Sequence, residues 1–416
     1  MRNIVICCDG TGSQISENIS NVLKLYRCLR KTDKTTPRQL VHYDPGIGTL
    51  ARPDPWRKLW QDFKVELGLL TGYGLDDTVL TAYEFLVNHY QEGDRIFLFG
   101  FSRGAYTVRV LAGLIHKVGL IAPEQINLAG YGLTAYKQFS QQYPDNAVLP
   151  PQFVDHSDGE PNPVDRYDAA AQFARITSAR LPTIHFMGVW ETVASIIVPR
   201  RDRLYWPSLE ELAYTMENPS VKTFRQAISI DERRTSFRVK RWKEPQPFLS
   251  NRFIPPDKVE AQDSRQVWFA GVHMDIGGAY PEAQSALSKY PLLWMIDEAC
   301  ACGLTVNPQT VKHLGWGELR RGSPFTYVAP DVRGELHDPM TLGWRIMEYV
   351  PKRAKYREWP QRKVHMGFYI PAAEPRFIQD GALIHESAIQ RMNVTDYRPV
   401  NLPGRYEIVP MPMPPD

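Results

Sequence analysis

The stretch RIFLFGFSRGAYTVRVLAGLIH, residues 95–116, decides the fold. Residues 95–99 form the short apolar run of a buried strand, and residues 105–116 repeat apolar side chains at helical spacing. The Gly-Phe-Ser-Arg-Gly between them predicts a turn that leads directly from a strand into a helix. Glycine suits both flanking positions because such a turn leaves no room for a Cβ atom. We expect the turn to raise the hydroxyl of Ser102 above a sheet as a nucleophile; the alternative is a tight turn in which Ser102 only caps the helix.

Strands and helices alternate on both sides of this stretch. Apolar, β-branched runs typical of strands occur at residues 3–8, 40–43, 183–189 and 266–272. This alternation predicts an α/β fold, a mostly parallel sheet with helices on both faces. We expect a single domain over residues 1–416. It would carry loop-rich insertions at about 120–182 and 196–262, and the second would rise over the active-site edge as a lid.

A serine nucleophile needs a base, and the base needs a carboxylate that orients it. In a parallel sheet these groups come from loops that follow the strands. Glu191 follows the strand predicted at 183–189, and His273 follows the strand predicted at 266–272. We therefore expect His273 as the base and Glu191 as the acid. Asp275 is an alternative acid, and His385, in the last segment of the chain, is an alternative base.

The first predicted strand ends in Asp9-Gly10-Thr11-Gly12. Backbone N–H groups in such a small-residue loop can stabilise an oxyanion, so we expect Gly10 and Thr11 to act together with the N–H of Arg103. The loop also resembles a phosphatase pattern with a nucleophilic Asp two places before Asp-Gly-Thr, but that place holds Cys7. A metal-dependent phosphoester hydrolase that uses the Asp9 loop is therefore the alternative enzyme class.

Composition excludes several classes of protein. The 416 residues are 43% hydrophobic and 23% charged, which excludes disordered and collagen-like chains. The 49 basic and 46 acidic residues give a net charge of +3, too small for a dedicated nucleic-acid binder. The five cysteines show neither zinc spacing nor a disulfide framework. For the serine-hydrolase interpretation we expect no metal and no other cofactor.

No stretch predicts a membrane span or a cleavable signal peptide. The chain has no run of about 18 uncharged apolar residues, and its N-terminus enters a strand-like run at once. We expect a protein that is cytoplasmic where it is made, and any export would use a route without a cleavable signal. The sequence leaves the oligomeric state open.

Seven short motifs, in order, carry a resemblance to a known family. They are CDGTGSQ with NISNVLKLY, YDPGIGT, GFSRGAYTVRVLAGLI, GVWETVAS, AISIDERR, VWFAGVHMDIGGAYPE and IHESAIQRM. The sequence resembles the catalytic domain of the type VI secretion phospholipase effectors, the Tle1-like family, which implies an α/β-hydrolase fold. The resemblance implies a Ser/Asp/His esterase acting on lipids, with Ser102 as nucleophile and His273 as base. The sequence departs from the family at Glu191, where the family has Asp, and at Gln226, where it has His.

Together these features predict a serine hydrolase of carboxylic esters, with phospholipids as the leading substrate class. The alternative outside enzymes is a hydrolase fold that serves as a binding module. The segment from Lys222 to Lys243 carries eight Lys or Arg residues with interleaved Phe224, Phe237 and Trp242. Such a segment would suit peripheral contact with an anionic membrane surface. The alternative is that its aromatic side chains point into the core.

Overall fold

One parallel sheet of eight strands organises the molecule. The computed structural model describes residues 1–10, 19–46, 74–142, 168–193, 197–199, 207–209, 212–251, 254–255 and 258–414. The strand order in the sheet is β14-β13-β10-β7-β4-β3-β1-β2, and every neighbouring pair is parallel. In chain order the strands are β1 (Asn3–Cys8), β2 (Gln39–Asp44), β3 (Arg95–Phe101), β4 (Ile184–Trp190), β7 (Val221–Ser229), β10 (Asp263–Phe269), β13 (Ala382–His385) and β14 (Tyr406–Val409). The predicted α/β fold with a parallel sheet is confirmed.

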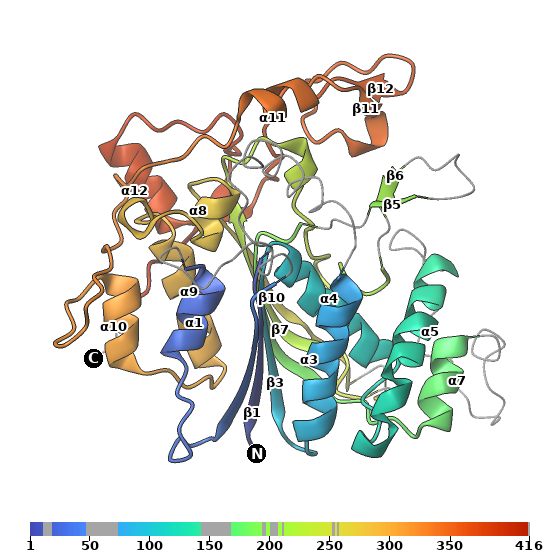
Figure 1. Ribbon diagram of the computed structural model, residues 1–416. Coiled ribbons are helices and arrows are strands. Elements are labelled where there is room, and N and C mark those ends of the chain that lie inside the picture. Colours follow the sequence, from blue (N-terminus) through green and yellow to red (C-terminus); the bar gives the residue numbers. More distant parts are fainter. Residues whose placement is uncertain are drawn as a thin grey trace, which may run out of the picture.

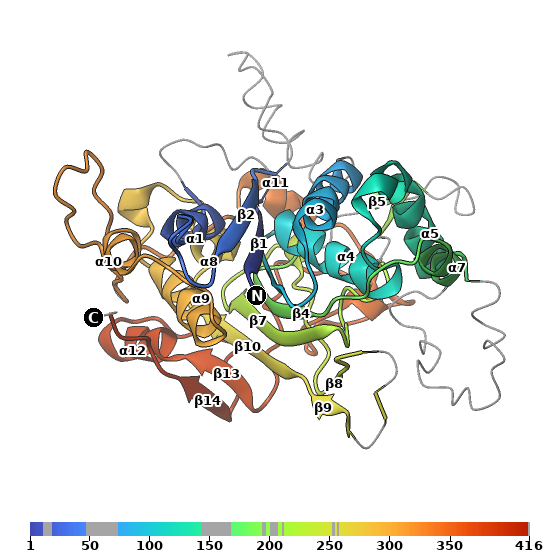
Figure 2. The ribbon, with the colours of Figure 1, turned by 90° about the horizontal axis from the view of Figure 1, so that it is seen from below.

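Helices cover both faces of the sheet, as predicted (Figure 1). One face carries α3 (Leu75–His89), α4 (Arg103–Lys117), α5 (Ala129–Gln142) and α7 (Ala169–Ile176). The other face carries α1 (Asn21–Cys28), α9 (Lys289–Ala301) and α10 (Pro308–Trp316). Figure 2, viewed from below, shows the sheet between these two groups.

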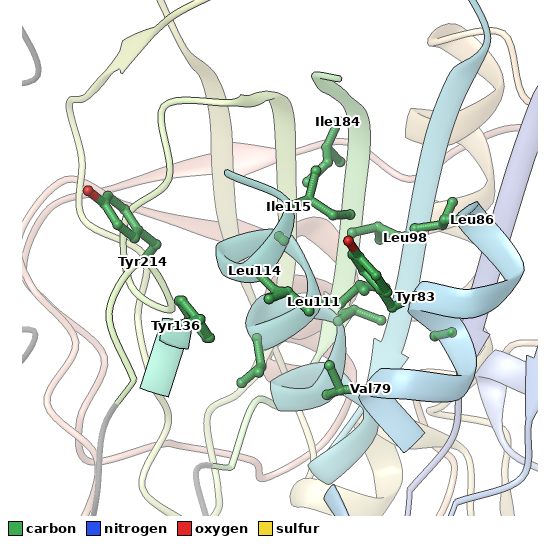
Figure 3. Close-up of a cluster of buried hydrophobic side chains, with 14 of the residues drawn as sticks. Val79, Tyr83, Leu86, Leu98, Leu111, Leu114, Ile115, Tyr136, Ile184 and Tyr214 are labelled. Atoms are coloured by element: carbon green, nitrogen blue, oxygen red, sulfur yellow. The ribbon is translucent and has the colours of Figure 1, made fainter. Parts of the chain in front are cut away.

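Each strand serves two cores because successive side chains of a strand point to opposite faces. Ile4 and Ile6 of β1 belong to the core beneath α3 and α4, whereas Val5 and Cys7 belong to the core beneath α1 and α9. In the first of these cores, side chains of α3 and α4 pack together over the sheet (Figure 3). Because the central strands are buried on both faces, their sequences are continuous apolar runs.

The chain changes direction across the sheet at β1. This strand lies between β2 and β3, so the chain adds β2 on one side and then returns to add β3 on the other. In open α/β sheets, ligands bind outside the carboxyl ends of the strands at such a switch point. Asp9 directly follows β1, and Ser102 directly follows β3. The topology therefore brings the two motif-bearing loops to one edge of the sheet.

The prediction of an insertion over residues 196–262 is wrong for part of that range. Residues 221–229 form β7, which lies within the sheet between β4 and β10. Before β7, the described residues form a small antiparallel pair, β5 (Ile197–Pro199) and β6 (Pro207–Leu209). After it come the 3₁₀ turn η4 (Thr235–Phe237), β8 (Pro247–Phe248) and β9 (Glu260–Ala261). The charges of β7 hide its apolar pattern in the sequence.

Two of the three aromatic side chains of residues 222–243 do not face lipid. Phe224 and Trp242 are buried and stacked, with ring centroids 4.2 Å apart. Arg225 is buried too, and its guanidinium binds carboxylate oxygens of Asp263 at 2.8 Å and Glu298 at 2.5 Å. These aromatic side chains point into the core, which was the alternative.

The insertion predicted at 120–182 is helical where it is described. It contains the 3₁₀ helix η2 (Pro123–Leu128), then α5 and α7, and residues 143–167 lie outside the described part of the chain. The last hundred residues add more to the fold than the sequence pattern indicated, because β13 and β14 extend the sheet. They also carry α11 (Leu342–Met347), β11 (Lys352–Arg353), η7 (Ala354–Tyr356), β12 (Phe368–Tyr369) and α12 (Glu386–Val394). None of the helices described here is long and apolar enough to cross a membrane.

Candidate active site

The turn after β3 holds Ser102 in a conformation that an L residue rarely adopts. Ser102 has φ 57° and ψ −118°, between the last residue of β3 and the first residue of α4. A Cβ atom on Gly104 would lie 2.1 Å from the carbonyl oxygen of Cys8, and a Cβ atom on Gly100 would lie 2.4 Å from the carbonyl oxygen of Gly104. Only glycine fits these two positions, so the sequence pattern and the strained turn have one steric cause.

His273 contacts both of the other predicted catalytic residues. It is the first residue of α8 (His273–Gly277), directly after the loop that follows β10. Its Nε2 atom lies 2.9 Å from Oγ of Ser102, and its Nδ1 atom lies 3.1 Å from Oε2 of Glu191. Because an ionised carboxylate only accepts hydrogen bonds, Nδ1 carries the proton and Nε2 is left to accept the proton of the serine hydroxyl. Three residues from three separate strand ends thus form one hydrogen-bonded chain.

Glu191 is a fully buried carboxylate with strong partners. It directly follows β4 with φ 46°, a left-handed conformation that turns its side chain under the histidine. Arg376 donates to both of its oxygens at 2.8 Å, and the backbone N–H of Ser229 donates to Oε1 at 2.7 Å. Burial alone would raise the pKa of Glu191, but Arg376 and His273 outweigh it and lower the pKa to about 2. The carboxylate therefore stays ionised at any ordinary pH.

The imidazole of His273 is enclosed by aromatic rings. Phe101 lies 4.9 Å from it and Phe237 lies 5.0 Å from it, measured between ring centroids. Burial lowers the pKa of His273 below the usual value of 6.5, although the hydrogen bond to Glu191 opposes this shift. The ring is therefore neutral at neutral pH, which is the state a general base requires.

A second buried ion pair fixes the backbone of the histidine. Glu232 accepts a hydrogen bond from the backbone N–H of His273 at 3.2 Å, and Arg234 donates to both Glu232 oxygens at 2.9 Å. Burial would raise the pKa of Glu232, but Arg234 lowers it. The guanidinium of Arg234 also stacks over the ring of Phe237 at 3.7 Å. The loop after β7 thus supports His273 from both its backbone and its ring.

The predicted oxyanion donors differ in how they are placed. Arg103 is the first residue of α4, so its N–H lies at the positive end of that helix, directly after Ser102. Gly10 packs against the nucleophile turn: a Cβ atom on it would lie 3.4 Å from Cβ of Ser102. Its N–H donates to Oδ1 of Asp9 at 2.7 Å, so in this conformation the N–H is engaged by the neighbouring side chain. Thr11 lies outside the described residues.

The carboxylate of Asp9 is occupied by neighbouring side chains. Its Oδ2 atom accepts hydrogen bonds from the hydroxyl of Ser20 and, at 2.8 Å, from the phenol of Tyr43. Within the described ranges no three His, Cys, Asp or Glu side chains gather as metal ligands do. The Asp9 carboxylate is therefore engaged by hydroxyl donors of the protein itself.

The two alternative site residues have other partners. Asp275 accepts hydrogen bonds from the backbone N–H of Val272 at 3.0 Å and binds Nδ1 of His337 at 2.6 Å. Nδ1 of His385 accepts a hydrogen bond from the backbone N–H of Ser387 at 3.2 Å, and its ring stacks on Phe269 beside β13. In this geometry neither residue takes the place that Glu191 or His273 fills, so Asp275 as acid and His385 as base stay alternatives that only kinetics of variants can test.

Sequence reasoning missed several residues that hold the site. The most important is Arg376, which lies in an irregular segment where no motif marks it. Glu232 and Arg234 belong to the AISIDERR motif. An acid and a base two positions apart in that motif could have indicated an ion pair near the site. Phe237, one of the three aromatic residues of the basic segment 222–243, packs on His273.

Comparisons with known proteins place the chain in a family. Residues 2–298 match the family described as T6SS, Phospholipase effector Tle1-like, catalytic domain. An uncharacterized protein of Saccharomyces cerevisiae, YEL023C, is 31% identical over 244 residues, which are 57% of this chain and 32% of that protein. The chain thus spans about a third of the length of this relative.

Two solved structures show low similarity. An uncharacterized protein from Pseudomonas aeruginosa has a TM-score of 0.36 and 19% identity, covering 74% of this chain and 47% of that chain. The Tle1 effector bound to the VgrG spike of the type 6 secretion system has a TM-score of 0.32 and 18% identity, covering 69% of this chain and 52% of that chain. Because the family match extends over well more than half of its residues, the chain belongs to the Tle1-like family of type VI secretion phospholipase effector catalytic domains.

Proposed function

We propose that the protein is a serine hydrolase that cleaves carboxylic esters of lipids, with Ser102 as nucleophile, His273 as general base and Glu191 as the acid that orients it. One observation carries the proposal: the continuous chain of hydrogen bonds from Oγ of Ser102 through both ring nitrogens of His273 to Glu191, at 2.9 Å and 3.1 Å. This arrangement of nucleophile, base and orienting carboxylate is the one that recurs in acyl-transfer enzymes on unrelated folds.

The acylation step follows from this geometry. Oγ of Ser102 attacks the carbonyl carbon of the ester while its proton passes to Nε2 of His273. Glu191 stabilises the imidazolium that results, and Arg376 keeps the carboxylate ionised. The bond from the acyl carbon to the leaving oxygen then breaks, and Nε2 returns the proton to that oxygen. The products are a free alcohol and an acyl ester on Ser102.

Deacylation repeats the same proton path with water. Nε2 of His273 takes a proton from water as the water oxygen attacks the acyl carbon, and it then returns the proton to Oγ of Ser102 as the carboxylic acid leaves. Negative charge develops on the acyl oxygen in both steps. We assign one oxyanion donor to the N–H of Arg103, where the N-terminus of α4 favours negative charge.

The proposed substrate class is the phospholipids, and this part rests on the family. Membership of a phospholipase effector family supports an ester linked to a phosphorylated head group. The site itself supports only the ester chemistry, because its described side chains select no head group or acyl chain length. Export without a cleavable signal, as in a secreted effector, is likewise proposed from the family alone.

A fluorophosphonate probe tests the enzyme class and the nucleophile together. We expect one covalent adduct on the intact protein, and digestion followed by mass spectrometry should map it to Ser102. Release of fatty acid from phosphatidylglycerol vesicles should be lost after labelling and unaffected by a chelator of divalent ions. Labelling at another residue would reject the assigned nucleophile. Turnover of a phosphomonoester that a chelator abolishes would instead support the phosphoester hydrolase, and failure of both assays would support a binding module.

A further inference from the structure

The segment from Leu342 to Ile370 exposes an unusual concentration of large apolar side chains. Six of them are 48% or more exposed: Leu342, Ile346, Tyr349, Val350, Met366 and Phe368. Scattered exposed apolar residues are ordinary, but a contiguous group of them marks an interaction surface. The segment lies beyond residues 2–298, so the family match assigns it no role.

Backbone hydrogen bonds join the segment into one unit. β11 and β12 pair in antiparallel fashion, and the N–H of Ala354 donates to the carbonyl of Gly367 at 2.8 Å. The N–H of Ala372 donates to the carbonyl of Glu348 at 2.9 Å, which ties the end of α11 to the residues that follow β12. Figure 1 shows α11, β11 and β12 at the top of the molecule, toward the same end of the sheet's strands as α8. We call residues 342–370 the docking surface.

The charge of the docking surface is positive on its outside. Residues 342–370 contain seven Lys or Arg residues and two Glu residues. Both acids face inward: Glu348 is buried and accepts from the N–H of Thr235 at 2.8 Å, and Glu358 pairs with Arg238 at 3.6 Å. The exposed residues Arg353 and Lys363 form no salt bridge within the described chain. Cations surrounding exposed apolar side chains complement an anionic lipid surface rather than a protein of mixed charge.

The inner side of this surface contacts the active site. The buried ring of Trp344 on α11 packs against Phe237 with centroids 5.6 Å apart, and Phe237 packs against His273. A cavity of about 490 Å³ lies beside α11, lined in part by Arg345, Tyr349 and Val272, the residue that precedes His273. Only the ring of Phe237 therefore lies between Trp344 of the docking surface and His273.

We propose that the docking surface seats the protein on a lipid surface rich in anionic head groups. Its exposed apolar side chains enter the boundary between head groups and acyl chains, while the exposed Arg353, Lys355 and Lys363 bind lipid phosphates. The purpose of this contact rests on the proposed function, because it brings the ester-bearing lipid to the edge of the sheet where Ser102 lies. The binding itself requires no turnover, so it is measured in a Ser102→Ala background.

Flotation with vesicles tests the proposal. One variant changes Leu342, Ile346 and Tyr349 to Ser, and a second changes Arg353, Lys355 and Lys363 to Gln. A matched control changes the loop after α10, where Leu319→Ser and Phe325→Ser remove side chains that are 86% and 60% exposed. A charge control in the same loop is Arg320→Gln with Arg321→Gln. Circular dichroism and the Tm show whether each variant is folded.

The expected result is binding to phosphatidylglycerol vesicles that is at least about tenfold tighter than binding to phosphatidylcholine vesicles. It should weaken strongly at about 1 M salt, where the Debye length falls to about 3 Å. Both docking variants should lose at least about tenfold in affinity, and both controls should stay within about twofold of the parent.

Equal affinity for the two kinds of vesicle, or equal losses in the docking and control variants, would overturn the proposal. So would a dimer in solution that the Leu342, Ile346 and Tyr349 changes convert to a monomer, because the surface would then bind a second copy. The proposed function fails by a different result, the absence of a fluorophosphonate adduct on Ser102, which leaves vesicle binding unaffected.

Discussion

Arg376 donates one hydrogen bond to each oxygen of the Glu191 carboxylate, and both bonds are 2.8 Å long. The same carboxylate also faces Nδ1 of His273. A buried cation thus neutralises the charge that would otherwise act on the histidine alone. We assign Arg376 as a positioning residue: it acts through Glu191 and does not touch the reacting atoms.

The Arg376→Gln variant should shift the pH dependence of turnover upward. Without the guanidinium, the full charge of Glu191 acts on His273 and raises the pKa of the imidazole, so the acid limb of kcat/KM moves to higher pH. Glu191→Gln should shift the limb the other way, because the carboxylate that raises the pKa of His273 is gone. Breaking a buried ion pair also costs about 3–5 kcal/mol of stability.

The pH–rate profiles of both variants, with Arg405→Gln as an exposed control, check this prediction. Opposite shifts support the positioning role. A fall in the Tm of Arg376→Gln with no shift in the acid limb of kcat/KM would show that Arg376 has only a structural role.

Ser102→Ala should abolish ester hydrolysis and leave the fold intact. Removing the nucleophile of such a triad lowers kcat by a factor of at least about 10⁴. The Tm should change little, since the hydroxyl lies at a partly exposed turn and alanine keeps the Cβ atom. Enzyme assays and thermal melts of this variant beside Ser250→Ala, which changes an exposed serine, test both statements. Full turnover in a clean Ser102→Ala preparation would end the serine-hydrolase proposal.

The sequence predicted the parts of the site that local sterics and strand ends determine. Gly100 and Gly104 mark the turn because any Cβ there would clash with backbone atoms. Glu191 could be found because it directly follows β4, and His273 because it follows β10 after the short stretch 270–272. Parallel strands end at one edge of the sheet, so these residues could be expected to meet.

The parts that the sequence did not reveal depend on long-range packing. Arg376 reaches Glu191 across 185 positions of sequence, and no local periodicity encodes that contact. β7 was missed because the guanidinium of Arg225 is buried against two carboxylates, so a charged residue occupies a core strand. The engagement of the Gly10 N–H by Asp9 depends on a side-chain rotamer, which no sequence pattern specifies.

Asp275→Asn should lower the stability of the protein and have little effect on its turnover. Asp275 accepts from the N–H of Val272 at the start of α8 and binds His337, so its loss should cost about 0.5–2 kcal/mol, as other helix caps do. Turnover by the folded variant should stay within about tenfold of the parent, whereas Glu191→Gln should lower kcat by about 10⁴-fold. Steady-state kinetics and chemical denaturation of the two variants measure these effects. A reversed ranking, with Asp275→Asn the inactive variant, would assign the acid to Asp275.

His385→Gln should make the fold less sensitive to acid. His385 is fully buried, and burial lowers its pKa to about 3, against 6.5 in the unfolded chain. Between these values the unfolded chain binds a proton that the folded protein excludes, so the free energy of unfolding falls as the pH drops from 6.5 toward 3. The slope is about 1.4 kcal/mol per pH unit, which gives about 2 kcal/mol at pH 5. Glutamine does not titrate, so the variant should lose that much less stability between pH 7 and pH 5.

Urea denaturation at the two pH values measures this difference, with His365→Gln as the exposed control. Since His385 lies outside the Ser102–His273–Glu191 chain of hydrogen bonds, the folded variant should also keep its esterase activity at pH 7. An unchanged pH dependence would show that His385 titrates normally in the folded state. A folded but inactive variant would instead indicate that His385, and not His273, is the general base.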